Sequence, residues 1–377
     1  MKVAIVWNHT SRLLDCSFRF EQYLAGFRAL GHEPVIVCQE GRDAGFPEPA
    51  TTYPADAFED PAMWREIDAE VGVIVTWHRM SRTLQAMRQA GTRVIAISDS
   101  DGQIGIRVHT RATFDRLWMY HNGLAAKARC LKYWLGKYLA KGAEEDREHL
   151  ESTRHSDVLV LGSSEGRRNF GQFLAYHGED ALFERVTVLP FNIGASFLAC
   201  PLPDRKADRL VAIGRWGDPQ KHAGLLVAAL ERLFAERPGT EIVILGGGGE
   251  PWFEPMSQRF PQVDYRGVTE QAEVARTLAS SRAIVFSSRW EGSPHAANEA
   301  LATGATLIGT PIPSLVSWSE GSRFGRIAEK ATAGALAQAM LDEMTDWDQG
   351  RRDHRAIAEE WRRRLEPATI CRQLLAS

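Results

Sequence analysis

The sequence predicts an α/β fold in which two doubly wound, Rossmann-like domains face each other across a cleft. Short runs rich in valine and isoleucine alternate with longer amphipathic stretches, as in parallel sheets covered by helices. The chain has 377 residues, which is long enough for two separate cores. A proline-rich segment near the middle divides the apolar runs into two series.

Six apolar runs in the first half are expected to form strands. They lie at residues 3–7, 35–38, 73–77, 94–98, 158–162 and 186–189. The stretch after the first run is typical of a helix, because Phe20, Leu24 and Phe27 recur at helical spacing. A sheet covered by helices therefore accounts for residues 1–195, the expected N-terminal domain.

A linker follows the sixth run, because Pro190, Pro201 and Pro203 interrupt any regular element there. Five further runs follow it, at residues 210–214, 241–245, 263–266, 284–287 and 306–310. The second domain is expected at residues 196–350. Residues 351–377 are expected to form a basic amphipathic helix that packs back toward the N-terminal domain.

The composition argues against nucleic-acid-binding, secreted and membrane-spanning proteins. A formal net charge of −3 gives no general reason to expect nucleic acid as a partner. The five cysteines form no C-x-x-C pair, so reduced thiols in the cytoplasm fit best. The apolar run after Lys2 is too short for a signal peptide or a membrane span.

The strongest signal for chemistry is the segment SSRWEGSPHAANEALATGATLIGTP, which follows an apolar run. Seven residues separate Glu291 from Glu299, so one carboxylate lies in a turn and the other early in a helix. Each carboxylate can accept hydrogen bonds from sugar hydroxyls, and free N–H groups at the helix start can hold an anion. The plain alternative is that the helix dipole alone favours a glutamate there.

In this segment the chain resembles retaining GT-B glycosyltransferases that carry an E-x7-E motif, the family 4-like enzymes also called glycosyl transferases group 1. The motif reads EGSPHAANE here. The upstream segments AIGRWGDPQKHAGLLVAAL, EIVILGGGGE and VDYRGVTEQAEVARTLASSRAIVFSS resemble the family's phosphate-binding loop and the strands after it, in order. The resemblance covers most of residues 185–345.

The resemblance implies a role for each charged residue. Arg215 and Lys221 would hold the donor diphosphate, Glu291 the sugar hydroxyls and Glu299 the nucleotide ribose. Fixed cations suit this chemistry, because charge builds on the leaving phosphate. The other implied donor-side residues are Gly246 in a glycine turn, Val268 beside the base, and Gly292, Ser293, Pro294 and His295 along the sugar.

The expected reaction is metal-independent hexosyl transfer from a nucleotide-diphosphate sugar with retention of configuration. The leaving phosphate would take the acceptor proton, so no cofactor is implied. The acceptor is left open between a glycan, a lipid-linked molecule and a small molecule. Two alternatives remain: a catalytically silent relative that binds a glycan or a partner protein, and a sugar-nucleotide epimerase.

The first half departs from the family pattern. Asn8 and His9 stand where family members often carry a glycine pair, and Asp99 and Asp101 stand where many have a histidine. These four residues are the candidates for the acceptor side. The two aspartates could instead form a turn, or hold a metal as a D-x-D motif does, although no metal site is expected. A nicotinamide fingerprint fails, because Pro251 occupies the third glycine position.

Residues 111–141 combine seven basic side chains with six aromatic ones and a single acid. Such a helical surface fits a peripheral contact with anionic lipid at the inner face of a membrane, which would suit a lipid-linked acceptor. It also fits the wall of an acceptor groove, or a packing surface with lysines directed outward.

Overall fold

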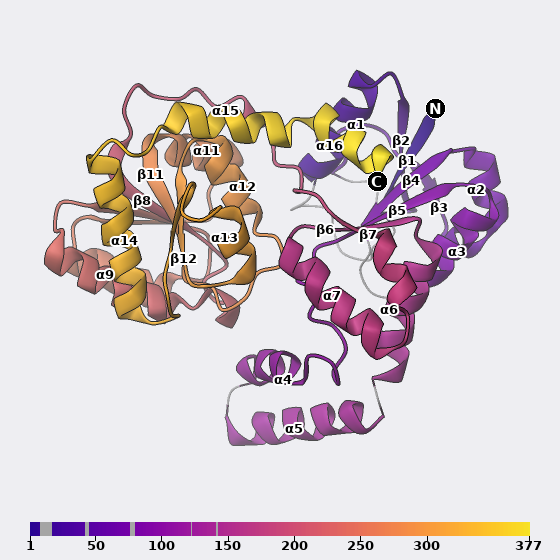
Figure 1. The fold of residues 1–377 in the computed structure, drawn as a ribbon, viewed down its shortest axis with the longest axis horizontal. Coiled ribbons are helices and arrows are strands. Elements are labelled where there is room, and N and C mark those ends of the chain that lie inside the picture. Colours follow the sequence, from indigo (N-terminus) through magenta and orange to yellow (C-terminus); the bar gives the residue numbers. More distant parts are fainter. Residues whose placement is uncertain (8–16, 42–44, 76–79, 122, 141) are drawn as a thin grey trace. The chain divides into compact units, whose positions relative to one another are not determined.

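The computed structural model describes the chain except residues 8–16, 42–44, 76–79, 122 and 141. It contains two compact units, one formed by Met1–Asn192 with Pro367–Ser377 and the other by Ile193–Glu366. Each unit has its own parallel sheet (Figure 1). Each also has its own apolar core. The predicted fold of two doubly wound α/β domains is therefore confirmed. The division falls at residues 192/193, whereas the sequence placed it at 195/196.

The sheet of the first unit has the strand order β3-β2-β1-β4-β5-β6-β7, and every pair is parallel. Its strands are β1 (Lys2–Trp7), β2 (Glu33–Gln39), β3 (Thr51–Tyr53), β4 (Val71–Val75), β5 (Arg93–Ser98), β6 (Val158–Leu161) and β7 (Val186–Val188). The central strands are buried on both faces, which explains their continuous runs of valine and isoleucine. Each predicted run coincides with one of these strands, and only the short edge strand β3 was missed.

Helices surround this sheet. They are α1 (Ser17–Ala29), α2 (Pro61–Ile67), α3 (Ser81–Gln89), α4 (Thr110–Met119), α5 (Leu124–Leu139), α6 (Ala143–His155), α7 (Ser164–Tyr176) and α16 (Pro367–Ala376), with the 3₁₀ turns η2 (Ala55–Glu59) and η3 (Asp180–Arg185). Helices α4 and α5 pack on each other and extend away from the sheet (Figure 1). Across the described ranges, no helix is both long enough and apolar enough to span a bilayer.

The sheet of the second unit has the order β10-β9-β8-β11-β12-β13 and is also parallel. Its strands are β8 (Ala207–Ile213), β9 (Glu241–Leu245), β10 (Val263–Gly267), β11 (Ser281–Phe286), β12 (Thr306–Gly309) and β13 (Gly325–Ile327). Its helices are α8 (Ala195–Leu198), α9 (Ala223–Glu236), α10 (Glu250–Arg259), α11 (Gln271–Ser280), α12 (His295–Ala302), α13 (Pro313–Trp318), α14 (Ala333–Asp348) and α15 (His354–Leu365), with the 3₁₀ turn η4 (Pro219–Lys221). The edge strand β13 was not predicted.

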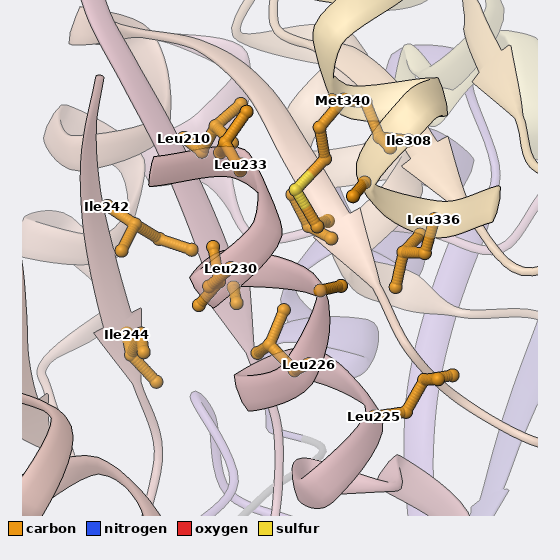
Figure 2. Packing of buried hydrophobic residues seen from close by; sticks show 14 of the residues in the cluster. Leu210, Leu225, Leu226, Leu230, Leu233, Ile242, Ile244, Ile308, Leu336 and Met340 are labelled. Carbon is orange, nitrogen blue, oxygen red and sulfur yellow. The ribbon is translucent and has the colours of Figure 1, made fainter. Parts of the chain in front are cut away.

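Leucines of α9 form the centre of this unit's core. Leu226, Leu230 and Leu233 recur at helical spacing and are fully buried. They pack between the sheet and α14, whose Leu336 and Met340 belong to the same cluster (Figure 2). Burying side chains of this size contributes about 1.5–3 kcal/mol each, so the core holds the sheet in place without help from the loops that follow its strands.

The prediction of one helix over residues 351–377 is wrong. The chain forms α15 and α16 instead, separated at Glu366, whose ψ of 130° is not helical. Pro367 causes the break, because proline disfavours the helical conformation in the residue before it. Helix α15 packs on α12 in the second unit, and α16 packs on α1 in the first.

Candidate functional site

The loop after β8 is fixed against the end of β9. Gly214 donates its N–H to the carbonyl of Leu245 at 3.1 Å, and Trp216 donates to Gly247 at 2.9 Å. The indole of Trp216 also donates to Leu245, at 2.9 Å. Between these anchors the side chain of Arg215 is 80% exposed, and its nearest carboxylate is Asp218 at 3.4 Å. A rigid loop therefore presents a guanidinium that remains open to a ligand.

After η4, the same loop ends at His222, whose backbone is strained. Asp218 caps η4 by accepting the N–H of Gln220 at 2.9 Å. His222 then adopts the left-handed conformation, with φ 51° and ψ 53°, before α9 begins. This conformation costs a non-glycine residue about 1–2 kcal/mol. Burial, with the nearby charge of Arg289, lowers the pKa of His222 to about 4, so its imidazole is neutral.

The Glu291 carboxylate lies at the centre of a hydrogen-bonded cluster and is only 8% exposed. It accepts a bond from the Lys221 ammonium at 2.6 Å and one from the Ser288 hydroxyl at 2.7 Å. The amide of Gln220 donates to its other oxygen at 3.2 Å. A carboxylate offers about four acceptor sites. One site therefore remains for a ligand hydroxyl, and the three donors fix its direction.

Backbone contacts hold the two loops of this cluster together. Gln220 donates its amide to the carbonyl of Trp290 at 2.7 Å and accepts the N–H of Arg289 at 2.8 Å. The Ser287 hydroxyl donates to the carbonyl of Lys221 at 2.7 Å. Three hydrogen bonds thus tie the loop after β11 to the loop after β8.

Helix α12 follows directly. It begins at His295, and the preceding Pro294 has no side chain that can cap its first N–H groups. Within the described ranges, the buried hydroxyl of Ser293 has no hydrogen-bond partner. Glu299 lies in the second turn of the helix, where burial raises the pKa of its carboxyl to about 7. Buried polar groups without partners are rare and often mark a site that a ligand completes.

A glycine turn lies at the end of β9. Gly246 has φ 105°, and a Cβ there would lie 1.9 Å from the carbonyl oxygen of Gly214. Only glycine allows this close approach of the two loops. A Cβ on Gly247 would meet the side chain of Val268 at 3.1 Å. Val268 itself is 87% exposed, so an open apolar surface borders the turn.

The donor-side residues named from the sequence all lie in the second unit. Strands β8, β9, β10 and β11 are parallel, so the loops that follow them leave the sheet at one edge. Of the four charged residues, the structure joins Lys221 directly to Glu291, whereas Arg215 bonds to Asp218. The Glu299 carboxylate makes no hydrogen bond or ion pair with the described part of the chain.

The acceptor-side candidates belong to the first unit. Asn8 and His9 lie outside the described residues. Asp99 accepts two bonds from the Arg19 guanidinium, each at 3.1 Å, and Asp101 forms an ion pair with Arg116. Asp101 also accepts the N–H of Gln103 at 3.2 Å, which is the turn geometry considered for this segment. Arginine thus occupies the carboxylate oxygens that a D-x-D metal site would need.

Comparison with known proteins supplies the deciding observation. Residues 207–346 match the family model described as Glycosyl transferases group 1. The second unit is a group 1 glycosyltransferase domain. The matched range contains β8 to β13 and every donor-side residue considered above. The predicted resemblance to glycosyl transferases group 1 is therefore confirmed over residues 207–346.

A curated relative is the phosphatidyl-myo-inositol mannosyltransferase of Mycolicibacterium smegmatis, which is 25% identical over 193 residues. The match spans 48% of this chain and 48% of that protein, so it covers about half the length of the curated relative.

Solved structures share the whole fold. A glycosyltransferase from Rickettsia africae has a TM-score of 0.63 at 14% identity, covering 100% of this chain and 97% of that one. HepE from Anabaena, in complex with UDP, has a TM-score of 0.62 at 11% identity, with coverages of 100% and 99%. The UDP-GlcNAc 2-epimerase of Methanocaldococcus jannaschii reaches 0.57 at 9%, also with 100% and 99%. At these identities the likeness establishes the GT-B fold alone.

Sequence reasoning missed two residues that orient the Glu291 carboxylate through hydrogen bonds. Gln220 and Ser288 have no chemistry of their own that a motif would mark. Gln220 reaches the carboxylate from 71 positions away along the chain. A signal existed only for Ser288, because it stands three residues before Glu291 in the same loop.

Proposed function

We propose that the chain is a retaining, metal-independent glycosyltransferase that moves a hexosyl group from a nucleotide-diphosphate sugar to an acceptor. The observation that carries this proposal is the Lys221–Glu291 pair, at 2.6 Å, beside a glycine turn and an exposed Arg215. Phosphate-binding and hydroxyl-binding groups thus share one edge of the glycosyltransferase domain.

Arg215 and Lys221 would stabilise the diphosphate as the glycosidic bond breaks. Their charges are held on a fixed loop, so little reorganisation is needed when negative charge develops. Lys221 would contact phosphate while it keeps its bond to Glu291. The departing phosphate would accept the acceptor proton on the face it leaves, which gives retention without a side-chain base.

Two glutamates would recognise the rest of the donor. Glu291 has one acceptor site left for a sugar hydroxyl, and its direction is fixed by three donors. Glu299 would accept the ribose hydroxyls, which requires its carboxyl to lose the proton that burial favours. The backbone of Gly292, Pro294 and His295 and the hydroxyl of Ser293 would line the sugar. Val268 would border the base, and Gly246 would let the nucleotide approach the turn.

The acceptor is proposed to bind the first unit, through Asn8, His9, Asp99 and Asp101. A lipid-linked acceptor is favoured, because the curated relative is a phosphatidyl-myo-inositol mannosyltransferase. We therefore place the enzyme in the cytoplasm, with a peripheral contact between residues 111–141 and the membrane. No metal or other cofactor takes part in the proposed chemistry.

The first test measures turnover in Glu291→Gln and Arg215→Ala. Each variant removes a group that stabilises the transition state, so kcat should fall about 10²- to 10³-fold. Arg276→Ala is the matched control, because Arg276 is an exposed arginine of the same unit, paired with Glu273. Wild-type turnover in both site variants would contradict the proposal.

The donor would be identified by thermal shift with UDP-, GDP- and dTDP-sugars, mannosyl donors first, because a ligand of the native state raises its melting temperature. Two results would redirect the assignment. No binding heat with any nucleoside diphosphate would indicate a silent relative. Conversion of the sugar nucleotide to an epimer without acceptor would indicate an epimerase, an activity that also occurs on this fold.

A further inference from the structure

Helices α4 and α5 are joined by aromatic side chains that face each other. Phe114 packs on Trp118 at 5.4 Å between ring centroids and on Trp134 at 5.2 Å. Trp134 in turn stacks on Tyr138 at 5.1 Å. Phe114, Trp118, Trp134 and Tyr138 thus form one aromatic cluster that joins the two helices, whereas Tyr120 and Tyr133 of the same segment are exposed. The cluster determines which face of α5 points inward.

Next to the aromatic face, α5 carries a row of exposed leucines. Leu124, Leu131, Leu135 and Leu139 lie in this row with Ala128, at successive spacings of four, three, four and four residues. The leucine side chains are 90%, 40%, 43% and 72% exposed in the order of the sequence. We call this set the leucine row. An apolar row along a whole surface helix is unusual in a protein that contacts only water.

The charges beside the leucine row favour one kind of binding partner over another. Helix α5 contains three lysines, one arginine and no acidic residue, although the chain as a whole has a net charge of −3. Arg129 and Lys132 are exposed and lie beside the leucine row on the side away from Trp134. Lys127 lies over the ring of Trp118 at 5.0 Å, and Lys137 pairs with Glu145. A protein surface would need acidic groups placed to match. An anionic bilayer offers apolar depth and negative headgroups together, whatever their spacing.

We propose that α5 docks the first unit on an anionic membrane, with the leucine row below the headgroups and Arg129 and Lys132 among them. The 16 residues of α5 form a helix about 24 Å long, which can lie in the plane of the interface. This membrane contact would bring the enzyme to a lipid-linked acceptor. Its role therefore rests on the proposed function.

The test is co-sedimentation of the full chain with vesicles that contain neither donor nor acceptor. Vesicles of phosphatidylcholine with phosphatidylglycerol should bind the protein, and vesicles of phosphatidylcholine alone should bind it far less. The double variant Leu131→Ser/Leu135→Ser should lose roughly tenfold or more in partitioning. Val316→Ser is the matched control, since Val316 is 49% exposed on a helix of the other unit, and it should bind as the wild type does.

Variants that remove a positive charge test the electrostatic part of the membrane contact. Arg129→Gln and Lys132→Gln should each weaken binding to anionic vesicles roughly fivefold at low salt, and added salt should reduce the difference. Wild-type affinity in the leucine variant, or equal binding to neutral and anionic vesicles, would overturn the proposal. So would a dimer that dissociates in the leucine variant without any vesicle binding, because the row would then join two copies of the chain.

The two proposals can fail separately. Glu291→Gln should be inactive yet bind vesicles as the wild type does, because Glu291 lies in the other unit. Active wild-type protein that ignores anionic vesicles would overturn the membrane contact and leave the transfer reaction in place.

Discussion

At the scale of single residues, Glu299 is the group whose titration should be visible. Burial raises the pKa of its carboxyl to about 7 in the folded protein, from an ordinary value of 4.5. The folded state thus holds a proton between these pH values that the unfolded state releases. The contribution of Glu299 to stability is therefore most favourable below pH 4.5 and becomes unfavourable as the pH rises toward 7.

This prediction is checked by melting curves of the ligand-free protein between pH 4.5 and 8. The wild type should lose stability relative to Glu299→Gln as the pH rises, and the difference should level off above pH 7. Glu329→Gln, which alters an exposed glutamate of the same unit, should follow the wild type at every pH. Parallel curves for wild type and Glu299→Gln would mean that Glu299 is ionised throughout.

The sequence could name the individual candidate residues, but it could not predict the contacts between them. The resemblance assigned Lys221 to phosphate and Glu291 to sugar, as separate groups. Their ion pair joins positions 70 residues apart and depends on how closely two loops approach. That approach is set by hydrogen bonds from Gln220 and Ser287, which are properties of the folded chain.

At the scale of elements, the left-handed His222 links η4 to α9 and fixes the direction in which Lys221 leaves the turn. The strain should be relieved in His222→Gly, because glycine adopts this conformation without a clash. We expect His222→Gly to raise the free energy of unfolding by about 1 kcal/mol, measured by urea denaturation of the second unit. His222→Ala keeps the strain and should not be stabilised.

The same pair of variants separates strain from side-chain chemistry. If the backbone of residue 222 alone positions Lys221, His222→Gly should retain turnover. Loss of turnover in both variants, with the fold intact, would show instead that the imidazole contacts the substrate.

Most elements could be predicted because strands buried on both faces carry a strong apolar signal. The two missed strands, β3 and β13, are three residues long and lie at sheet edges, where one neighbour is absent and polar residues are tolerated. The tail was misjudged because amphipathic periodicity continues from α15 into α16. Pro367 breaks the backbone without breaking that pattern.

At the scale of the whole molecule, the end of the chain completes the first unit. Helix α16 packs on α1, and the thiol of Cys371 lies 3.8 Å from the carbonyl oxygen of Tyr23. Gly26 allows this contact, because a Cβ there would lie 2.4 Å from the carbonyl oxygen of Pro367. The chain therefore leaves the first unit after Asn192, forms the second, and returns.

Gly26→Ala should separate α16 from α1, because neither the Pro367 backbone nor the Cys371 thiol can yield without moving the helix. Overpacking of this kind costs about 1–3 kcal/mol. Hydrogen exchange should show faster exchange in α1 and α16, whereas β8 to β13 keep their protection, because their core contains no residue of either helix.

Gly136→Ala is the matched control: a Cβ there has no atom within 4 Å, so it should stabilise α5 by about 0.5–1 kcal/mol. Unchanged exchange in α1 and α16 of Gly26→Ala would mean that the tail is not docked in solution.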